Sequence, residues 1–364
     1  MESNQGKLAV LDEKRTFFIQ SEDLPKPGPG EVLVQVLMAT VCKSDCHTFH
    51  GHRDAPLPSV LGHEASGVVI GLPESPVCDI NGQLLAIGVP VVWSIFAAPG
   101  EDTFALRGMI QKSLGVLKYG HQDNRLTPFS GGFASHILLR PGTAIACLSP
   151  EIPAAVAAPL NCSLATMVGA FRLGGAPSGA SVAIMGCGML GLHGLAYAKT
   201  KGFSKIVGVD IVSERRVRAL SFGATIVYTF EEWAASRETF DLVIDTTGVT
   251  AAMEQSLEHL GIGGTAVWVG AVFPSSKVAI DPERIIRHLI SIKGLHKYNE
   301  SDFKEAVSHL EAHHRGFPFE SLVNPIFPLE EIAAAFDWYE VPATYRVGII
   351  PGANPSLDGG NRAD

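Results

Sequence analysis

Four side chains in this sequence have the chemistry of zinc ligands: Cys42, His63, Glu64 and Cys162. Thiolate, imidazole and carboxylate groups all bind zinc in proteins. Taken singly, Cys42 could be a small buried apolar residue, and His63 could be a hydrogen-bonded core residue. Cys162, however, lies on an apolar segment that leads into a nucleotide-binding motif. A helix there would bring a further ligand to a cleft between two domains, beside a nicotinamide, and so complete a dehydrogenase site.

The nucleotide-binding motif is G-x-G-x-x-G on Gly186, Gly188 and Gly191, after an apolar strand and before a helix of small residues. The first glycine would make the tight turn, the second would let a pyrophosphate approach the backbone, and the third would let helix and strand pack closely. Asp210 ends the next strand, where a carboxylate binds ribose hydroxyls and repels a 2′-phosphate. We therefore expect NAD rather than NADP. Arg215 and Arg216 stand nearby, as cofactor contacts or as solvated helix residues.

The elements that must position these residues fall into two kinds. The chain up to about residue 150 reads as short strands, and an apolar helix follows over 154–173. Strands expected at 181–185, 205–209, 225–228, 242–244, 265–269 and 291–293 then alternate with helices. Such alternation predicts an α/β domain with a doubly wound parallel sheet. We place this domain at 157–298, and a β-rich catalytic domain at 1–156 and 299–364.

The bulk properties fit a globular protein of 364 residues in two domains, with 46% hydrophobic and 18% charged residues. A net charge of −9 argues against nucleic acid or an anionic membrane as the main partner. The apolar stretch 84–99 is too short to span a bilayer. No secretory leader is visible, and the six cysteines suit a reducing compartment, so we expect a cytoplasmic protein.

The sequence resembles the zinc-binding medium-chain dehydrogenase/reductase family over about residues 8–350. The resemblance lies in the order along the chain of Cys42, Gly62-His63-Glu64, Cys162 and the glycine motif. The resemblance implies a GroES-like catalytic domain and a Rossmann domain. It implies zinc on Cys42, His63 and Cys162, with Glu64 as an exchanging or outer ligand. It also implies that Asp45 orients the histidine ligand.

The same resemblance implies a proton relay from a zinc-bound alcohol through Ser44 and the cofactor ribose to His47. The plain alternative for Ser44 and His47 is ordinary loop polarity. Lys43 and Arg346 are implied as pyrophosphate contacts. The remaining cofactor contacts that we expect are Met189, Leu190, Arg215 and Gly270.

Many members of this family carry a four-cysteine structural zinc lobe, which would fall at 97–113 here. That stretch contains no cysteine, which excludes such a site. We expect the lobe to be held by packing or by a partner subunit. The family implies a homodimer or homotetramer.

Several blocks are similar to alcohol dehydrogenases proposed to act in phosphonate catabolism, which suggests a hydroxyalkylphosphonate or other small anionic alcohol as substrate. The candidate donors are Lys118, His121, Arg125, His296 and Lys297, although each could equally be solvent-exposed loop charge. Trp93 would narrow the substrate pocket.

Three alternative functions stay open at this point. One is a polyol or amino-alcohol dehydrogenase of the same family. Another is a metal-free quinone or enoyl reductase, which the four intact ligand positions disfavour. The last is a non-catalytic sensor of zinc or nucleotide, which would have no use for Ser44 and His47 as a relay.

Overall fold

A computed structural model describes residues 4–272 and 276–352 of the chain. It divides into two compact units: unit 1 comprises Met1–Cys162 and Glu320–Asp364, and unit 2 comprises Ser163–Phe319. The expected domain limits at 156/157 and 298/299 lie 6 and 21 residues before the corresponding limits of this division. The difference after residue 298 has a clear cause, because Asp302 on the following helix forms an ion pair with Arg172 of unit 2, at 2.5 Å.

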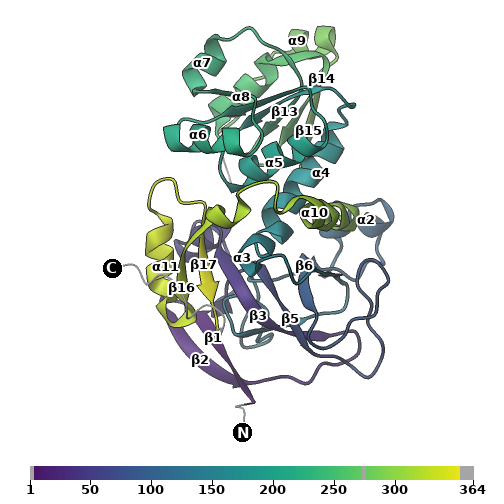
Figure 1. Ribbon diagram of the computed structural model, residues 1–364, viewed down its shortest axis with the longest axis vertical. Helices are drawn as coiled ribbons and strands as arrows, with labels where there is room; N and C mark the ends of the chain where they lie inside the picture. Colours follow the sequence, from purple (N-terminus) through teal and green to yellow (C-terminus); the bar gives the residue numbers. More distant parts are fainter. Residues whose placement is uncertain (1–3, 273–275, 353–364) are drawn as a thin grey trace. The chain divides into compact units, whose positions relative to one another are not determined.

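Unit 1 is built on an eight-stranded sheet and a three-stranded sheet. The larger sheet has the path β16-β17-β3-β5-β6-β7, with β8 pairing β3 and β9 pairing β6, and its pairs are antiparallel except β16 with β17 (Figure 1). The smaller sheet has the order β2-β1-β4. The strands of unit 1 are β1 (Gln5–Leu11), β2 (Phe17–Asp23), β3 (Val32–Val41), β4 (Ser59–Val60), β5 (Glu64–Gly71), β6 (Pro90–Ala97), β7 (Leu117–Lys118), β8 (His136–Leu139), β9 (Thr143–Cys147), β16 (Val323–Pro328) and β17 (Arg346–Ile350).

Helices of unit 1 are short and lie at strand ends. They are α1 (Lys43–Phe49), α2 (Thr103–Leu106), α3 (Ala154–Ala157) and α11 (Ile332–Tyr339), with 3-10 turns η1 (Ile110–Lys112) and η4 (Leu329–Glu331) and the π turn η2 (Leu160–Leu164). A further 3-10 turn, η3, covers Phe319–Leu322 where the chain returns. One contiguous core joins β1, β3, β5 and α11, including Leu8, Val34 and Phe336. This core fixes the end of β3, which Cys42 follows, and the start of β5, which His63 precedes.

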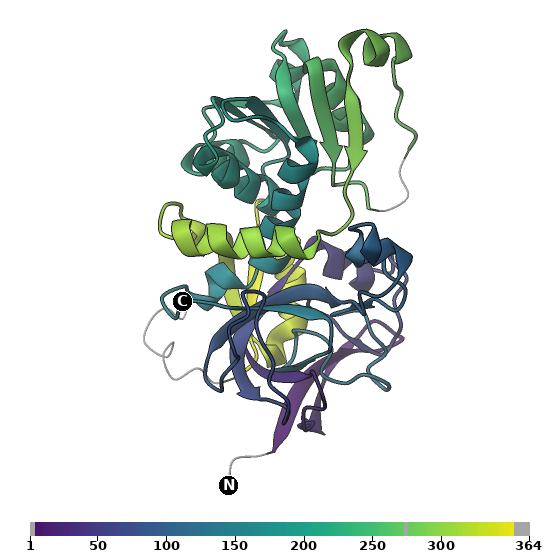
Figure 2. The ribbon, with the colours of Figure 1, turned by 90° about the vertical axis from the view of Figure 1, so that its right-hand side faces the viewer.

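Unit 2 contains a six-stranded parallel sheet of order β12-β11-β10-β13-β14-β15, whose green strands run side by side in Figure 2. Its strands are β10 (Ser181–Met185), β11 (Lys205–Val209), β12 (Ile226–Tyr228), β13 (Phe240–Asp245), β14 (Leu260–Trp268) and β15 (Ser291–Gly294). Its helices are α4 (Ala165–Gly174), α5 (Met189–Thr200), α6 (Ser213–Ser221), α7 (Phe230–Ala235), α8 (Thr250–Glu258), α9 (Pro282–His288) and α10 (Glu300–His313).

Helices cover both faces of this sheet, and the alternation of side chains along β10 shows it. Ala183 and Met185 belong to the apolar core that includes Trp233 and Leu257. Ile184 points to the opposite face, where a Cβ added to Gly194 of α5 would approach it within 2.9 Å. Parallel strands buried on both faces read as continuous apolar runs, as β10 does.

The segment Ala154–Gly174 is apolar and long enough to pass as a membrane span among the described residues. Its most apolar window is 78% buried inside the protein, which is typical of a core helix. The expected single helix over 154–173 is therefore present, but the π turn η2 interrupts it. This segment, and not 84–99, is the apolar stretch of membrane-spanning length.

Candidate metal centre and cofactor loop

The four expected zinc ligands lie together in unit 1. One ligand atom each of Cys42, His63, Glu64 and Cys162 lies within 4.8 Å of the others. Cys42, His63 and Glu64 are buried, and Cys162 is half-buried. Two sulfurs, one imidazole nitrogen and one carboxylate oxygen match the donor types and the number that zinc takes. We call this group the metal centre.

Local structure explains how residues distant in sequence meet there. Cys42 follows β3 and caps α1. Glu64 begins β5, the antiparallel neighbour of β3, and His63 immediately precedes that strand. Gly62 makes the entry to β5 possible because its φ of +87° is a left-handed conformation, and a Cβ there would lie 2.8 Å from the Phe133 nitrogen. Cys162 sits in the π turn η2, a geometry that is enriched at functional sites.

Asp45 holds the imidazole ligand in place from behind. Its Oδ1 lies 3.2 Å from the Nδ1 of His63, and it is fully buried. The same carboxylate accepts hydrogen bonds from the backbone N–H groups of Cys42, at 3.0 Å, and Gly62, at 3.3 Å. Burial disfavours the charged ring, yet Asp45 overcomes this and raises the pKa of His63 to about 9. The Nε2 of His63 is left to face the metal centre.

Arg346, expected as a pyrophosphate contact, lies inside the metal centre. It is 3% exposed and donates to Glu64 twice, from Nε at 2.6 Å and from Nη2 at 2.7 Å. Its Nη2 also lies 3.5 Å from the Cys42 sulfur, and its Nη1 donates to the Tyr345 carbonyl. Most of the guanidinium donors therefore face unit 1 groups, and the pyrophosphate contact stays a prediction.

The two thiols of the metal centre share a proton. The pKa of Cys42 lies well below its ordinary value because Cys162 donates a hydrogen bond to it and the charge of Arg346 favours the thiolate. The pKa of Cys162 is raised by that same hydrogen bond and by burial. Burial also raises the pKa of Glu64, against the opposing charge of Arg346. A thiolate that forms readily beside an imidazole and a second thiol is suited to a divalent cation.

The predicted relay residues lie on α1, next to the metal centre. The Oγ of Ser44 is buried and has no hydrogen-bond partner among the described residues. Burial, followed by the charge of Lys43, lowers the pKa of His47, whose ring lies 5.9 Å from that of His52. Lys43 itself is exposed. Ser44 is thus an available hydroxyl and His47 a neutral base.

One of the predicted substrate residues, His121, lies beside the metal centre, and a second, Lys118, contacts His121. The ring of His121 is 6.0 Å from that of His63, centroid to centroid. Its Nδ1 lies 3.2 Å from the Tyr119 carbonyl oxygen, and its Nε2 lies 3.3 Å from the Lys118 Nζ. Because a carbonyl only accepts and an ammonium only donates, Nδ1 carries the proton and Nε2 accepts from Lys118.

The other substrate candidates have different surroundings. Trp93 lies within β6, is fully buried and belongs to the core of unit 1, and its effect on a substrate pocket stays a prediction. Arg125 is exposed and pairs with Asp123 at 2.7 Å. His296 is an exposed residue of unit 2.

The glycine motif in unit 2 forms an open turn between β10 and α5. Gly186 has a φ of +94°, and a Cβ on Gly191 would lie 1.9 Å from the Gly186 carbonyl oxygen, so neither position tolerates a side chain. Gly188 caps α5 without a side-chain hydrogen bond, and no atom lies within 4 Å of where its Cβ would be. The first N–H groups of α5, at Met189 and Leu190, therefore lie next to open space that could accommodate a phosphate.

The other expected cofactor residues of unit 2 follow neighbouring strands of the sheet. Asp210 follows β11 and accepts from the N–H of Cys187 at 2.7 Å and of Val212 at 2.8 Å. Gly270 follows β14, and a Cβ there would lie 2.1 Å from the Gly248 nitrogen. Arg215 is half-buried on α6. The carboxyl ends of parallel strands are where such folds bind nucleotides.

Sequence reasoning missed several residues around these sites. Thr40 donates a 2.5 Å hydrogen bond to Glu64, and Arg53 lies within electrostatic reach of Asp45 and Cys42. In unit 2, the buried Asp245 binds the backbone N–H of Thr247 and Gly248 and so shapes the turn after β13. None of these belongs to a short motif, so the signals lay only in the folded arrangement.

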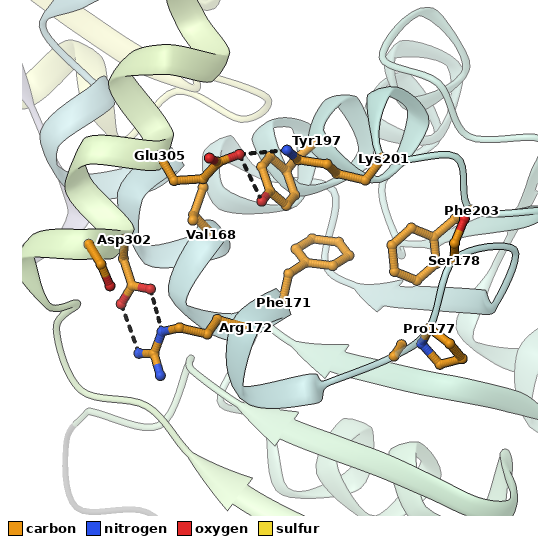
Figure 3. A pocket seen from close by; sticks show the side chains of 12 residues that line it. Val168, Phe171, Arg172, Pro177, Ser178, Tyr197, Lys201, Phe203, Asp302 and Glu305 are labelled. Atoms are coloured by element: carbon orange, nitrogen blue, oxygen red, sulfur yellow. Dashed lines mark hydrogen bonds and ion pairs between the residues drawn. The ribbon is translucent and has the colours of Figure 1, made fainter. Parts of the chain in front are cut away.

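A cavity of about 390 Å³ in unit 2 lies between side chains of α4, α5 and α10 (Figure 3). Phe171 lies 5.1 Å from Tyr197, ring to ring, and the charged groups are paired, Arg172 with Asp302 and Lys201 with Glu305. None of the predicted site residues lines it. Its rings and satisfied charges make it a structural hollow rather than a catalytic site.

Comparison with known proteins agrees with this geometry. Residues 28–148 match the model of the alcohol dehydrogenase GroES-like domain, and residues 190–312 match that of the zinc-binding dehydrogenase. The chain is 30% identical over 348 residues to an alcohol dehydrogenase from Geobacillus stearothermophilus, covering 92% of this chain and 95% of the relative. It is 28% identical to a D-altritol 5-dehydrogenase from Agrobacterium fabrum, covering 89% and 93%.

Among solved structures, an alcohol dehydrogenase from Thermotoga maritima superposes with a TM-score of 0.89 at 26% identity, covering 96% of this chain and all of that one. The expected fold, a GroES-like domain and a parallel-sheet nucleotide-binding domain, is thereby confirmed. The chain belongs to the zinc-binding alcohol dehydrogenase family.

Proposed function

We propose that this protein is a zinc-dependent, NAD(H)-linked dehydrogenase that interconverts an alcohol and its aldehyde or ketone. The observation that carries the proposal is the convergence of Cys42, His63, Glu64 and Cys162 within 4.8 Å, next to an unpartnered serine hydroxyl. A nucleotide-binding turn on unit 2 supplies the second requirement, a place for a hydride carrier. A sensor that only binds zinc or nucleotide would gain nothing from the hydroxyl at Ser44.

The donor set fits a catalytic zinc. Cys42, His63 and Cys162 are the three protein ligands that such a site needs, and Glu64 is held back by two hydrogen bonds from Arg346. Zinc bound there would supply a Lewis acid that lowers the pKa of an alcohol hydroxyl. Glu64 would occupy or vacate a coordination position as Arg346 competes for its oxygens.

Ser44 and His47 would manage the proton of the reaction. The buried Oγ of Ser44 is free to accept a hydrogen bond from a substrate hydroxyl and to take its proton. His47 has a lowered pKa, which keeps its ring neutral near pH 7 and able to receive a proton on its way to solvent. Asp45 would hold His63 in the tautomer that presents Nε2.

We propose NAD as the preferred cofactor. Asp210 is a carboxylate at the end of β11, where it would accept hydrogen bonds from ribose hydroxyls and repel a 2′-phosphate. The variant Asp210→Ala should bind NAD more weakly and discriminate less against NADP. An unaltered preference would show that another group selects the cofactor.

The proposed substrate is a small alcohol that carries an anionic group, such as a hydroxyalkylphosphonate. It is supported by His121, whose ring lies near that of His63, and by Lys118, which contacts His121. A polyol substrate is the second candidate, favoured by the similarity to the D-altritol 5-dehydrogenase. The assembly as a homodimer or homotetramer and the cytoplasmic location stay predictions.

The decisive experiment measures metal content and turnover together. Purified protein should contain one zinc per subunit and reduce NAD with a panel of neutral, polyhydric and anionic alcohols, followed by the absorbance of NADH. Removal of the metal with a chelator should stop the reaction, and added zinc should restore it. Turnover that survives complete metal removal would contradict the proposal.

A further inference from the structure

We propose that His193 is a positioning residue that couples the nucleotide-binding turn of unit 2 to the metal ligand Cys162. Through this coupling, a nucleotide at the N-terminus of α5 and a metal ion at Cys162 would each strengthen the binding of the other. The inference rests on the proposed function for the identity of the two ligands, but it can be tested without turnover.

The segment that carries Cys162 is held on both sides of that residue. On one side, the Nδ2 of Asn161 donates a hydrogen bond to the His63 carbonyl at 3.1 Å. On the other side, the Oγ of Ser163 lies 2.9 Å from the Nδ1 of His193. Asn161, Ser163 and His193 are all buried, so these bonds form away from water. The position of the Cys162 sulfur therefore depends on both bonds.

The chain passes from one unit to the other at this place. Unit 1 includes Cys162, and unit 2 begins at Ser163. The contact between Ser163 and His193 lies within unit 2, and a single peptide bond joins Ser163 to the metal ligand. His193 thus acts on the metal centre through the chain itself.

The same imidazole nitrogen contacts the first turn of α5. The Nδ1 of His193 lies 3.1 Å from the carbonyl oxygen of Met189. Because a carbonyl oxygen only accepts, Nδ1 carries the proton, and the hydroxyl oxygen of Ser163 accepts from it as well. One N–H group therefore holds both the beginning of α5 and the beginning of unit 2.

The Met189 carbonyl connects this contact with the position proposed for the phosphate. This carbonyl and the N–H of Leu190 belong to one planar peptide group. The N–H is among the first of α5 and lies next to the open space at Gly188, so a phosphate bound there would fix the peptide group. A fixed peptide group holds the imidazole, and the imidazole holds Ser163. Binding of a metal at Cys162 then requires less further loss of conformational freedom.

The end of unit 2 also packs on His193. Phe319, the last residue of unit 2, stacks on the imidazole with 5.3 Å between ring centroids and 18° between ring planes. Phe222 contacts Phe319 in an edge-on arrangement at 5.5 Å. Both passages of the chain between the units therefore meet one side chain, which is the arrangement expected of a positioning residue.

The test measures the binding of ADP-ribose to zinc-loaded and to zinc-free protein. ADP-ribose carries the pyrophosphate but no nicotinamide, so a contact between nicotinamide and metal cannot produce the coupling. We expect calorimetry on the wild type to give a dissociation constant for ADP-ribose that is about fivefold or more lower with zinc than without it. By linkage, ADP-ribose should raise the zinc affinity by the same factor, which competition with a chromogenic chelator measures.

Substitution of either contacting residue should remove the coupling. Ser163→Ala deletes the acceptor, and His193→Phe keeps a stacking ring but deletes Nδ1, so each should bring the factor close to one. His193→Asn returns an N–H donor near the position of Nδ1 and should restore part of the coupling. Ser256→Ala is the matched control and should keep the wild-type factor, because Ser256 is a buried serine of unit 2 that bonds to Met253 and Trp268.

Cobalt in place of zinc gives a second readout. ADP-ribose should shift the thiolate-to-cobalt absorption band of the wild type, and Ser163→Ala should abolish this shift while keeping the band. A variant that folds poorly would lose the band itself, so the spectrum separates lost coupling from lost structure.

These measurements separate the inference from the proposed function. If no alcohol is oxidised but zinc and ADP-ribose bind with a coupling that depends on His193, the reaction is wrong and the inference stands. If alcohols are oxidised but the wild type binds ADP-ribose equally well with and without zinc, the inference is overturned. A coupling that persists in both Ser163→Ala and His193→Phe would overturn it as well.

Discussion

The metal centre and the segment 98–116, which overlaps the stretch 97–113 expected for a structural zinc lobe and is called the lobe here, are both ordered loop regions, but different contacts order them. The metal centre gathers four side chains from three distant segments into a buried cluster. The lobe is ordered by one nearby carboxylate: Asp102 accepts from the N–H groups of Phe104 at 3.0 Å, Ala105 at 2.9 Å, and Leu114. Backbone hydrogen bonds from Ala105 and Leu114 hold the pKa of Asp102 below its usual range.

The contrast separates long-range order from local order. Side chains of the metal centre are buried and depend on β3, β5 and η2 all being in place. Two large apolar side chains of the lobe are largely exposed, Leu106 at 83% and Leu114 at 72%. A cap that joins residues 102 to 114 needs no tertiary fold. The expectation that packing or a partner subunit holds the lobe therefore omitted a capping carboxylate.

The largest effect is expected from removing a ligand of the metal centre. Cys42→Ala should lose the metal and reduce turnover to background, because three donors cannot replace the thiolate. NAD binding should persist, since the glycine turn belongs to unit 2. Metal analysis, turnover and NAD titration check this. Cys46→Ala is the matched control, since Cys46 is equally buried but outside the donor set, and an equal loss there would contradict the ligand assignment.

A second effect should appear in the stability of the metal-free protein. Arg346→Gln leaves the buried Glu64 carboxylate without its cationic partner, which costs about 3–5 kcal/mol of unfolding free energy for a buried pair. Urea unfolding in the presence of a chelator measures it. The double variant Glu64→Gln/Arg346→Gln should recover part of the loss, because it removes the orphan charge as well. Equal stability of single and double variants would show that the pair is not coupled.

A smaller effect, on zinc affinity, is expected from substituting Asp45, which contacts a ligand but is not itself a ligand. Asp45→Asn keeps the shape of the side chain but removes the charge that orients His63, so zinc affinity should fall by roughly tenfold to a hundredfold. Competition with a chromogenic chelator reads this directly. An unchanged zinc affinity would mean that the backbone around Gly62 alone positions the ring.

The smallest effect should be confined to the lobe. Asp102→Ala should speed proteolysis within 98–116 while zinc content and turnover stay close to wild type. Asp281→Ala, which removes a similar cap from α9, is the control and should leave the lobe unaffected. Adding a chelator to wild type should not accelerate cleavage of the lobe. If it does, the lobe depends on the metal centre and the contrast between the two regions fails.

The sequence could predict those parts of the molecule that rest on local pattern. The parallel sheet follows from strands that alternate with helices. The glycine turn follows from Gly186 and Gly191, where an added Cβ would clash with neighbouring atoms. The four ligands could be named because their order along the chain resembles a known family. These features can be recognised in the sequence without any knowledge of tertiary contacts.

Residues that act through tertiary contacts could not be found in this way. Arg53 belongs to no motif, and its electrostatic effect on the Asp45 region arises only from the folded arrangement. Arg346 was assigned to the cofactor, whereas the pairing of β17 with β3 brings it to Glu64. The burial of Trp93 likewise depends on the register of β6 against β9, which the sequence leaves open.

Because Cys162 lies in the π turn at Leu160–Leu164, its position depends on the number of residues in this segment. A π turn holds one residue more than an α turn, so the helices on its two sides are out of phase by one position. Deleting a single residue there would restore regular winding and swing the following side chains by about 100° around the axis. Cys162 would then point away from Cys42 although every ligand was still present, so an altered residue count could abolish metal binding as surely as a substitution.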